Sequence, residues 1–239
     1  MILDSFEFTY IGGREENQDF LGKKETAEAG IYVVADGLGG HEKGGLASKC
    51  AVKLLTEQWD ASAEPEESLL KEQIARANEG ILQLQQQENC VTKSTVALLC
   101  IAANKAAWAN TGDSRVYYIH DGELAEITAD HSVAYKKYKT GEITRAGIAM
   151  DEDQSRLFRS LGNSSRWEPN TYSCDELTSG DAFLLCSDGL WEYVLDEEVL
   201  VDYLKSETAQ EWGRRLLLRA IDRINSGNDN LSLITLMLK

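Results

Sequence analysis

The chain has 239 residues, of which 43% are hydrophobic and 27% are charged, and its formal net charge at pH 7 is −16. This length and composition predict a single globular domain over residues 1–239, with a core large enough to need no disulfide bonds. The negative charge argues against nucleic acid or an anionic membrane as the main partner.

The expected compartment is the cytoplasm. The N-terminal residues lack the basic and apolar regions of a signal peptide, and no run approaches the ~18 apolar residues of a membrane span. The five cysteines are odd in number and show no CxxC spacing. They are therefore interpreted as small core residues in a reducing environment.

Short strand-like runs predominate along the chain, with three amphipathic helices interspersed. Apolar residues at three- and four-residue spacing predict amphipathic helices over 45–59, 65–87 and 208–225. Pro65 suits a first helical turn, and Thr208 with Glu211 forms a capping-box pattern. An Asp121-Gly122 pair predicts a hairpin turn. Short apolar or alternating runs predict strands over residues 31–35, 94–102, 105–109, 116–119, 123–127, 182–186 and 231–238.

The segment 130–161 is polar and lacks a sustained period. A surface loop is the simplest interpretation, but a loop of this length inside a compact domain is more often functional than idle.

Five aspartates stand beside the predicted strands. Asp36 and Asp188 each follow a strand directly and precede a glycine. Asp229 comes just before the last strand, Asp113 lies between two strands, and Asp19 precedes an apolar pair. Ordinary turn chemistry explains each of these positions taken alone.

Taken together, the same positions permit a metal site. Carboxylates at neighbouring strand ends can converge in space, and they repel one another unless a cation compensates. Mn²⁺ and Mg²⁺ prefer oxygen ligands and keep several waters. With only three histidines, the chain offers no zinc cluster.

The glycine-rich stretch 37–41 follows a strand and precedes a helix, as a nucleotide loop does. A GxGxxG pattern would need glycine where Glu42 stands, and no GK[ST] sequence follows. We interpret Gly37 instead as a position where the backbone carbonyl can approach a metal ion.

The motifs occur in the order found in one family. The chain resembles the metal-dependent protein phosphatases, the PPM or type 2C serine/threonine phosphatases, and most of all their compact bacterial members. The resemblance covers residues 14–232, nearly the whole chain, and rests on REENQD (14–19), ADGLGGH (35–41), ST (94–95), TGDSR (111–115), DHS (130–132), SDGLW (187–191) and DNLS (229–232).

The resemblance implies an α+β fold, an αββα sandwich of two antiparallel sheets flanked by helices, with two Mn²⁺ or Mg²⁺ ions at one end. Asp36 is implied to bridge both ions, and the carbonyl of Gly37 to bind one of them. Asp188 and Asp229 are implied to hold the other ion. Asp113 is the candidate for a third, weaker ion.

The implied reaction is hydrolysis of phosphoserine or phosphothreonine in proteins by a metal-activated water. Arg14 is implied to bind the substrate phosphate, and a variable flap at about 131–160 to lie beside the site. The implied partners are a phosphoprotein substrate and a serine/threonine kinase pathway, and a monomer is expected.

Two positions depart from the family pattern. Leu38 replaces a histidine that is a proposed general acid in many animal members. His41 is the nearest titratable substitute, although it could instead cap the following helix, and a metal-bound water could also supply the proton. Gln18 replaces a frequent glutamate, which leaves Asp19 as an outer-sphere or direct ligand.

Two other functions compete with this one. The alternative is an inactive, regulatory member that binds phosphoproteins, but such a protein does not need to retain Arg14, Asp36, Asp188 and Asp229. A metal-dependent nuclease conflicts with the negative charge and the lack of a basic stripe.

Overall fold

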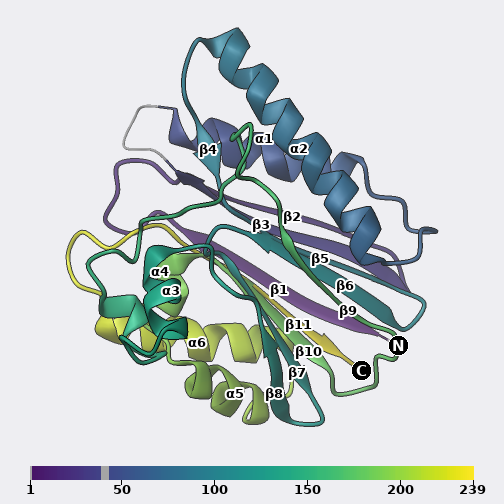
Figure 1. Ribbon diagram of the computed structural model, residues 1–239. Helices are drawn as coiled ribbons and strands as arrows, with labels where there is room; N and C mark the ends of the chain where they lie inside the picture. The colour runs from purple at the N-terminus through teal and green to yellow at the C-terminus, as the bar shows by residue number, and fades with distance from the viewer. Residues whose placement is uncertain (1, 39–42) are drawn as a thin grey trace.

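The structure, a computed structural model, describes residues 2–38 and 43–239 (Figure 1). Within these ranges the strands form two antiparallel sheets. One has the order β1 (Leu3–Tyr10), β11 (Leu231–Leu238), β10 (Ala182–Cys186), β7 (Arg115–His120), β8 (Glu123–Ile127). The other has the order β2 (Asp19–Glu25), β3 (Ala29–Leu38), β5 (Val96–Ala102), β6 (Lys105–Thr111), β9 (Asn170–Cys174), with the short β4 (Lys93–Ser94) paired to the end of β3.

Helices cover the outer face of each sheet (Figure 1). The sheet that contains β3 carries α1 (Gly44–Glu57) and α2 (Glu67–Glu88), and the other carries α5 (Asp196–Leu204) and α6 (Ala209–Arg223). The expected αββα sandwich of the α+β class is therefore confirmed. No helix among the described residues is both long enough and apolar enough to cross a bilayer.

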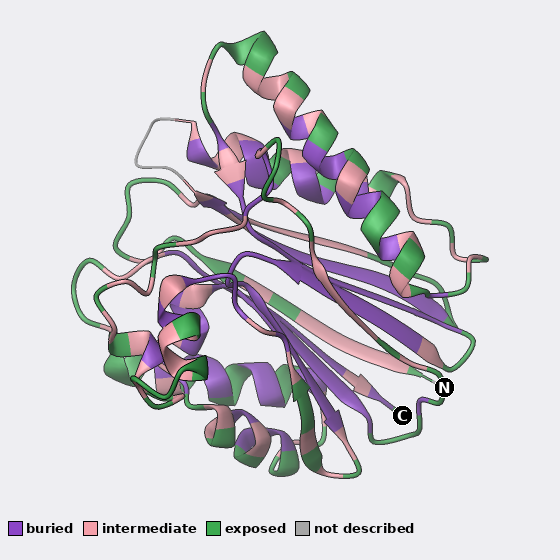
Figure 2. Cartoon of the chain, viewed as in Figure 1, coloured by how far each residue is buried: buried purple, intermediate pink, exposed green. Residues whose placement is uncertain are grey.

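The central strands of both sheets are buried on both faces, which explains the continuous apolar runs in their sequences (Figure 2). Alternate residues of β3 serve two cores, because successive side chains of a strand point to opposite faces. Ile31 and Val33 pack against α1 and α2, whereas Tyr32 and Val34 pack between the sheets. β11 divides its residues in the same way between the inter-sheet core and the α6 side.

The predicted strands and helices are all present, but several elements escaped the sequence patterns. These are the edge strands β1, β2 and β9, and the short helix α5. The segment 130–161, predicted to be a loop, contains α3 (Val133–Lys139) and the 3-10 helix η1 (Ile148–Met150). The remaining helix, α4 (Asp188–Trp191), begins directly after β10.

Three local expectations need correction. Pro65 lies outside α2, which begins two residues later at Glu67. Thr208 does cap α6, since its Oγ1 accepts from Glu211 N at 3.1 Å, but the Glu211 carboxylate accepts from Glu207 N instead of closing a capping box on Thr208. β3 extends to Leu38, so Asp36 lies within the strand and does not follow it. The Asp121-Gly122 turn is confirmed, with φ of 50° and 73°.

Candidate active site

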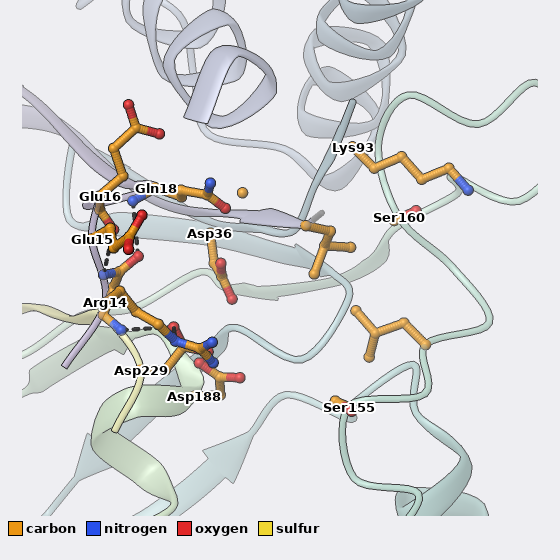
Figure 3. Close-up of a pocket in the computed structure, with 14 residues that line it drawn as sticks. Arg14, Glu15, Glu16, Gln18, Asp36, Lys93, Ser155, Ser160, Asp188 and Asp229 are labelled. Atoms are coloured by element: carbon orange, nitrogen blue, oxygen red, sulfur yellow. Dashed lines mark hydrogen bonds and ion pairs between the residues drawn. The ribbon is translucent and has the colours of Figure 1, made fainter. Parts of the chain in front are cut away.

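A pocket of about 970 Å³ opens where the end of β3 meets the start of α4 and the segment before β11 (Figure 3). Three of the predicted aspartates and the predicted arginine line it, although they are far apart in sequence. Its lining residues are Arg14, Glu15, Glu16, Gln18, Asp36, Gly37, Leu38, Lys93, Ser155, Leu157, Ser160, Asp188, Asp229 and Asn230.

Backbone pairing fixes Asp36. Its N–H donates to Thr95 Oγ1 at 3.0 Å, and its carbonyl accepts from Thr95 N at 2.8 Å and from Ser94 Oγ at 2.9 Å. At Gly37 a Cβ would lie 2.5 Å from Gly44 O and 2.9 Å from Gln18 O, so only glycine fits between these backbone segments. The carboxylate of Asp36 is thereby held at the pocket wall (Figure 3).

Asp188 and Asp229 reach the pocket from neighbouring strands of the other sheet. Asp188 is the first residue of α4, and Asp229 lies two residues before β11, separated from it by Asn230. The two segments are packed tightly, because a Cβ at Gly189 would collide with Asn230 O. Asn230 also anchors the N-terminal loop, since its Oδ1 accepts from Gln18 N at 2.8 Å and its Nδ2 donates to Glu16 O at 3.0 Å.

Asp19 lies behind Asp36, its direct partner in the β2–β3 ladder. Asp19 Oδ2 accepts from Ser187 Oγ at 2.8 Å, while its buried Oδ1 has no hydrogen-bond partner among the described residues. Burial raises the pKa of Asp19 to about 6, opposed in part by the Ser187 hydrogen bond. The residue therefore joins the cluster without lining its pocket.

Asp113 is buried beneath the pocket in the turn between β6 and β7. Its carbonyl accepts from Trp191 Nε1 at 2.9 Å, and its Oδ1 meets no hydrogen-bond donor in the part of the chain that the structure describes. Burial, followed by the charge of Asp130, raises its pKa to about 7. The charge of Asp113 also raises the pKa of Asp36 and of Asp188, although Asp113 does not line the pocket.

Asp36 and Asp188 have no cationic partner among the described residues. The pKa of Asp36 is raised well above its usual value by burial and then by the charge of Asp19. The pKa of Asp188 is raised in the same way by burial and then by Asp36. Buried carboxylates with unpartnered oxygens are the donor set that a hard divalent cation requires.

The arrangement limits how such an ion could be held. Among the described residues, no group of three or more His, Cys, Asp or Glu side chains is arranged to hold a metal ion by itself. Mg²⁺-type ions are commonly held by one or two carboxylates, with waters completing the shell. The residues present therefore fit ions that keep most of their water, and they do not form a closed all-protein cage.

Arg14 is paired with one of the aspartates. Its Nε and Nη2 donate to Asp229 Oδ1 and Oδ2 at 3.0 and 2.8 Å, in a bidentate ion pair (Figure 3). The hydrogen bond to Asp229 and the charge of that carboxylate raise the pKa of Arg14. The side chain is 54% exposed. The Nη1 N–H groups donate to no acceptor among the described residues, so they can donate to a ligand.

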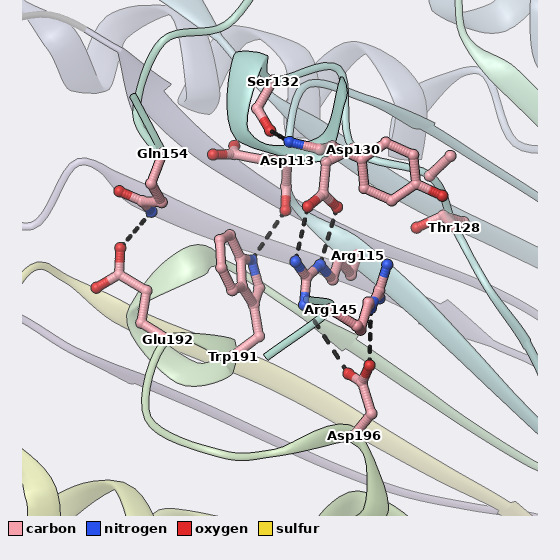
Figure 4. A network of polar contacts seen from close by, with 12 residues as sticks. Asp113, Arg115, Thr128, Asp130, Ser132, Arg145, Gln154, Trp191, Glu192 and Asp196 are labelled. Atoms are coloured by element: carbon pink, nitrogen blue, oxygen red, sulfur yellow. Dashed lines mark hydrogen bonds and ion pairs between the residues drawn. The ribbon is translucent and has the colours of Figure 1, made fainter. Parts of the chain in front are cut away.

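The segment 130–161 is fastened to the floor of the site by polar contacts (Figure 4). Arg115 donates from Nε and Nη2 to Asp130 at 2.8 and 2.7 Å and stacks on the Trp191 ring at 3.7 Å. Gln154 Nε2 donates to Glu192 Oε1. These contacts connect the flap to α4, the helix that begins at Asp188.

Several residues of the site were given no role by the sequence analysis. Ser187 and Asn230 stand in the motifs SDGLW and DNLS, next to predicted aspartates, and that adjacency was the available signal. Glu192 stands one helical turn after Asp188, and burial followed by the charge of Asp229 raises its pKa to about 7. Lys93 lies outside all of the sequence motifs, so nothing in the sequence indicated that it belongs to the site. His41, a predicted catalytic residue, lies outside the described residues.

Comparison with known proteins gives concordant results. Residues 11–216 match the family model of protein phosphatase 2C. A serine/threonine phosphatase of Listeria welshimeri is 33% identical over 92% of this chain and 90% of its own length. Stp1 of Staphylococcus aureus superposes with a TM-score of 0.87 at 27% identity, covering 100% of this chain and 96% of that one. The PstP catalytic domain, solved with two manganese ions, has a TM-score of 0.82 at 26% identity and covers 99% and 98%.

Proposed function

The chain belongs to the protein phosphatase 2C family of serine/threonine phosphatases, and we propose that it hydrolyses phosphoserine and phosphothreonine in proteins with divalent ions held in the pocket described above. One observation supports this proposal most strongly. Asp36, Asp188 and Asp229 line a single pocket together with Arg14, and the pKa values of Asp36 and Asp188 are raised by burial and by neighbouring carboxylates.

In this proposal Asp36 and the Gly37 carbonyl, together with Asp188 and Asp229, hold two ions, and Asp113 holds a weaker third. Asp19 supports Asp36 from behind, either directly or through a water. When bound, the ions offset the charge of the phosphate and make a water nucleophilic at neutral pH. Either Mn²⁺ or Mg²⁺ satisfies this oxygen-rich donor set.

Arg14 orients the phosphate. Two donors of its guanidinium hold Asp229, and the Nη1 donors face no protein acceptor among the described residues. A planar guanidinium can therefore bridge a carboxylate of the site and an oxygen of the phosphate. The pair with Asp229 also fixes the direction from which Arg14 approaches the pocket.

The leaving-group proton has no assigned donor among the described residues of the pocket. Leu38 lines the pocket but carries no proton, and Gln18 presents a neutral amide where a carboxylate is frequent. His41 stays a prediction from the sequence as the general acid. Because Gln18 contributes no charge, the ion beside it would be held mainly through water.

The biological setting follows from the reaction class. A serine/threonine kinase must supply the substrate, so we propose that the protein opposes such a kinase in a signalling pathway. A cytoplasmic location, a monomeric state and a single catalytic domain over residues 1–239 stay predictions. The inactive regulatory alternative is not favoured, because the site retains its arginine and its aspartates.

The test is hydrolysis of p-nitrophenyl phosphate and of a phosphothreonine peptide. We expect activity with Mn²⁺ that is lost with EDTA and lost in Asp188→Asn. Asp121→Asn is the matched control, because Asp121 lies in the distant β7–β8 turn and its side chain is 84% exposed. Equal activity in Asp188→Asn and Asp121→Asn, or activity unaffected by EDTA, would refute the assignment.

A further inference from the structure

Lys93 lines the same pocket as the aspartates, on the wall away from Arg14 (Figure 3). Asp36 lies between the two cationic side chains in this view, and Lys93 extends away from the aspartates. Lys93 therefore cannot serve the same end of the substrate as Arg14. Its position is that of a group that meets the substrate beside the phosphate.

Among the described residues, the charge of Lys93 has no partner, in contrast to that of Arg14. Arg14 is held by Asp229 in a bidentate pair. Lys93 makes neither an ion pair nor a side-chain hydrogen bond with any residue that the structure describes. The protein has a net charge of −16 and therefore repels anions overall, so the ammonium group of Lys93 attracts an anion to this wall of the pocket.

The backbone of Lys93 is firmly placed. Lys93 and Ser94 pair with Leu38 and Gly37 at the end of β3. Ser94 also exchanges two backbone hydrogen bonds with Leu161 at the end of the flap, at 3.2 and 2.8 Å. The lysine is thus attached both to the strand that carries Asp36 and to the flap, so its side chain starts from a fixed point.

The spacing suits a neighbouring residue of a peptide. Lys93 is the cross-strand partner of Leu38, which lies two positions after Asp36. Standard strand dimensions place the Cα atoms of Lys93 and Asp36 roughly 8 Å apart. An extended peptide advances ~3.3–3.6 Å per residue, so this separation corresponds to about two residues. Ser160 lies near Lys93 in Figure 3, and its hydroxyl adds a neutral donor on this wall of the pocket.

We propose that Lys93 determines substrate specificity by binding an anionic side chain, a carboxylate or a second phosphate, that lies one or two residues from the phosphorylated residue. The proposal rests on the proposed phosphatase function and defines its substrate class as acidic or doubly phosphorylated sites. Three rotatable N–H donors allow an ammonium group to accept either anion.

The test uses a set of phosphothreonine peptides in which the residues one and two positions away, on one side or the other, are Gln, Glu or a second phosphothreonine. The ratio of kcat/KM for the Glu peptide to that for the Gln peptide is measured in the wild-type protein, Lys93→Met, Lys93→Arg and Lys71→Met. Lys71 is an exposed residue of α2 away from the pocket and serves as the matched control.

We expect the wild-type protein and Lys71→Met to favour the Glu peptide by about two- to five-fold, the range for a partly exposed ion pair. Lys93→Met should lose this preference, and Lys93→Arg should keep it. A larger ratio for the doubly phosphorylated peptide identifies phosphate as the preferred anion. No preference in the wild-type protein, or the same preference in Lys93→Met, overturns the proposal.

A binding measurement separates this inference from the proposed function. Fluorescence anisotropy of the same labelled peptides gives the ratio of their dissociation constants without requiring turnover. If no peptide were hydrolysed with any metal, the phosphatase function would fail, whereas a binding ratio lost only in Lys93→Met would still support the role of Lys93. A ratio unchanged in Lys93→Met would exclude that role.

Discussion

Asp19 and Asp36 are direct cross-strand partners in the β2–β3 ladder. Like charges placed opposite one another destabilise a sheet, and burial adds a desolvation penalty to each charge. The pKa of both carboxyls is raised, with burial as the largest cause. The strands that build the site thus hold two acids at a position that favours a cation between or beside them.

Replacing Asp36 by Asn should stabilise the EDTA-treated protein. The substitution keeps the shape of the side chain and removes a charge that is opposed by Asp19, Asp113 and Asp229. We expect the melting temperature to rise by ~2–4 °C in EDTA, which corresponds to about 1 kcal/mol for a domain of this size. The stabilisation produced by added Mn²⁺ should shrink. Differential scanning fluorimetry with and without Mn²⁺ measures both effects, and a lower melting temperature in EDTA with an unchanged Mn²⁺ shift would contradict the prediction.

The EDTA-treated protein should lose stability as the pH rises from about 5 to about 8. Burial raises the pKa of Asp19 to about 6 and that of Glu192 to about 7. A carboxyl with a raised folded-state pKa contributes stability below its unfolded pKa, and this contribution is lost as the pH rises through the folded pKa. Glu192→Gln removes one such group, so its stability should decline less over this range.

One histidine acts in the opposite direction. Burial lowers the pKa of His131 to about 4, and its Nδ1 accepts from Gly112 N at 3.1 Å. Its neutral ring contributes stability above its unfolded pKa of ~6.5, and the contribution is lost as the pH falls through the folded value.

Urea denaturation of the wild-type protein and of Glu192→Gln at several pH values measures the contribution of Glu192 to the pH dependence of stability, because His131 is present in both proteins. Parallel curves for the two proteins would refute the assignment.

Replacing Arg115 alone should destabilise the fold far more than replacing Arg115 and its partner Asp130 together. Arg115 and Asp130 are 4% and 0% exposed, and they form a bidentate pair. Arg115→Met leaves the Asp130 charge buried without a partner, which typically costs ~3–5 kcal/mol. The double variant Arg115→Met/Asp130→Leu should recover much of that loss. Urea denaturation of the single and double variants tests this, and equal destabilisation of the two would contradict it.

The sequence was informative where one short segment carries both a structural and a chemical signal. Asp36 and Asp188 stand beside apolar runs that are buried on both faces, so strand and site could be predicted together. The edge strands β1 and β2 have one partner each within the described sheets and keep many polar residues, so their alternation is weak. Apolar patterns in the sequence therefore predict central strands better than edge strands.

Contacts between distant segments could not be predicted from spacing. The pair Arg14–Asp229 joins residues 215 positions apart, which the packing of β1 beside β11 brings together. Lys93 belongs to no recognisable pattern, because its significance depends on which residues face it. The aspartates, in contrast, were identified by their positions beside predicted strands, and the family resemblance supplied their expected roles as metal ligands.

The contact between Gly189 and Asn230 should control the spacing of two proposed metal-binding aspartates. A Cβ at Gly189 would collide with Asn230 O and lie 2.9 Å from Asn230 C. Both atoms are backbone, so the start of α4 must move away from β11. Since Asp188 precedes Gly189 and Asp229 precedes Asn230, Gly189→Ala should separate the two carboxylates. We expect a stability loss of ~1–3 kcal/mol from overpacking, and an Mn²⁺ affinity lower by about ten-fold.

Gly45→Ala is the matched control for this substitution. Its added Cβ would have its nearest neighbour, Gln18 Cα, at 3.5 Å, an ordinary contact, and alanine is the better helix residue within α1 by ~0.5–1 kcal/mol. Gly45→Ala should therefore bind Mn²⁺ like the wild-type protein and be slightly more stable. Isothermal titration with Mn²⁺ and urea denaturation of both variants measure the two effects. If Gly189→Ala lost stability but kept wild-type Mn²⁺ affinity, the Gly189 contact would support the fold without setting the distance between Asp188 and Asp229.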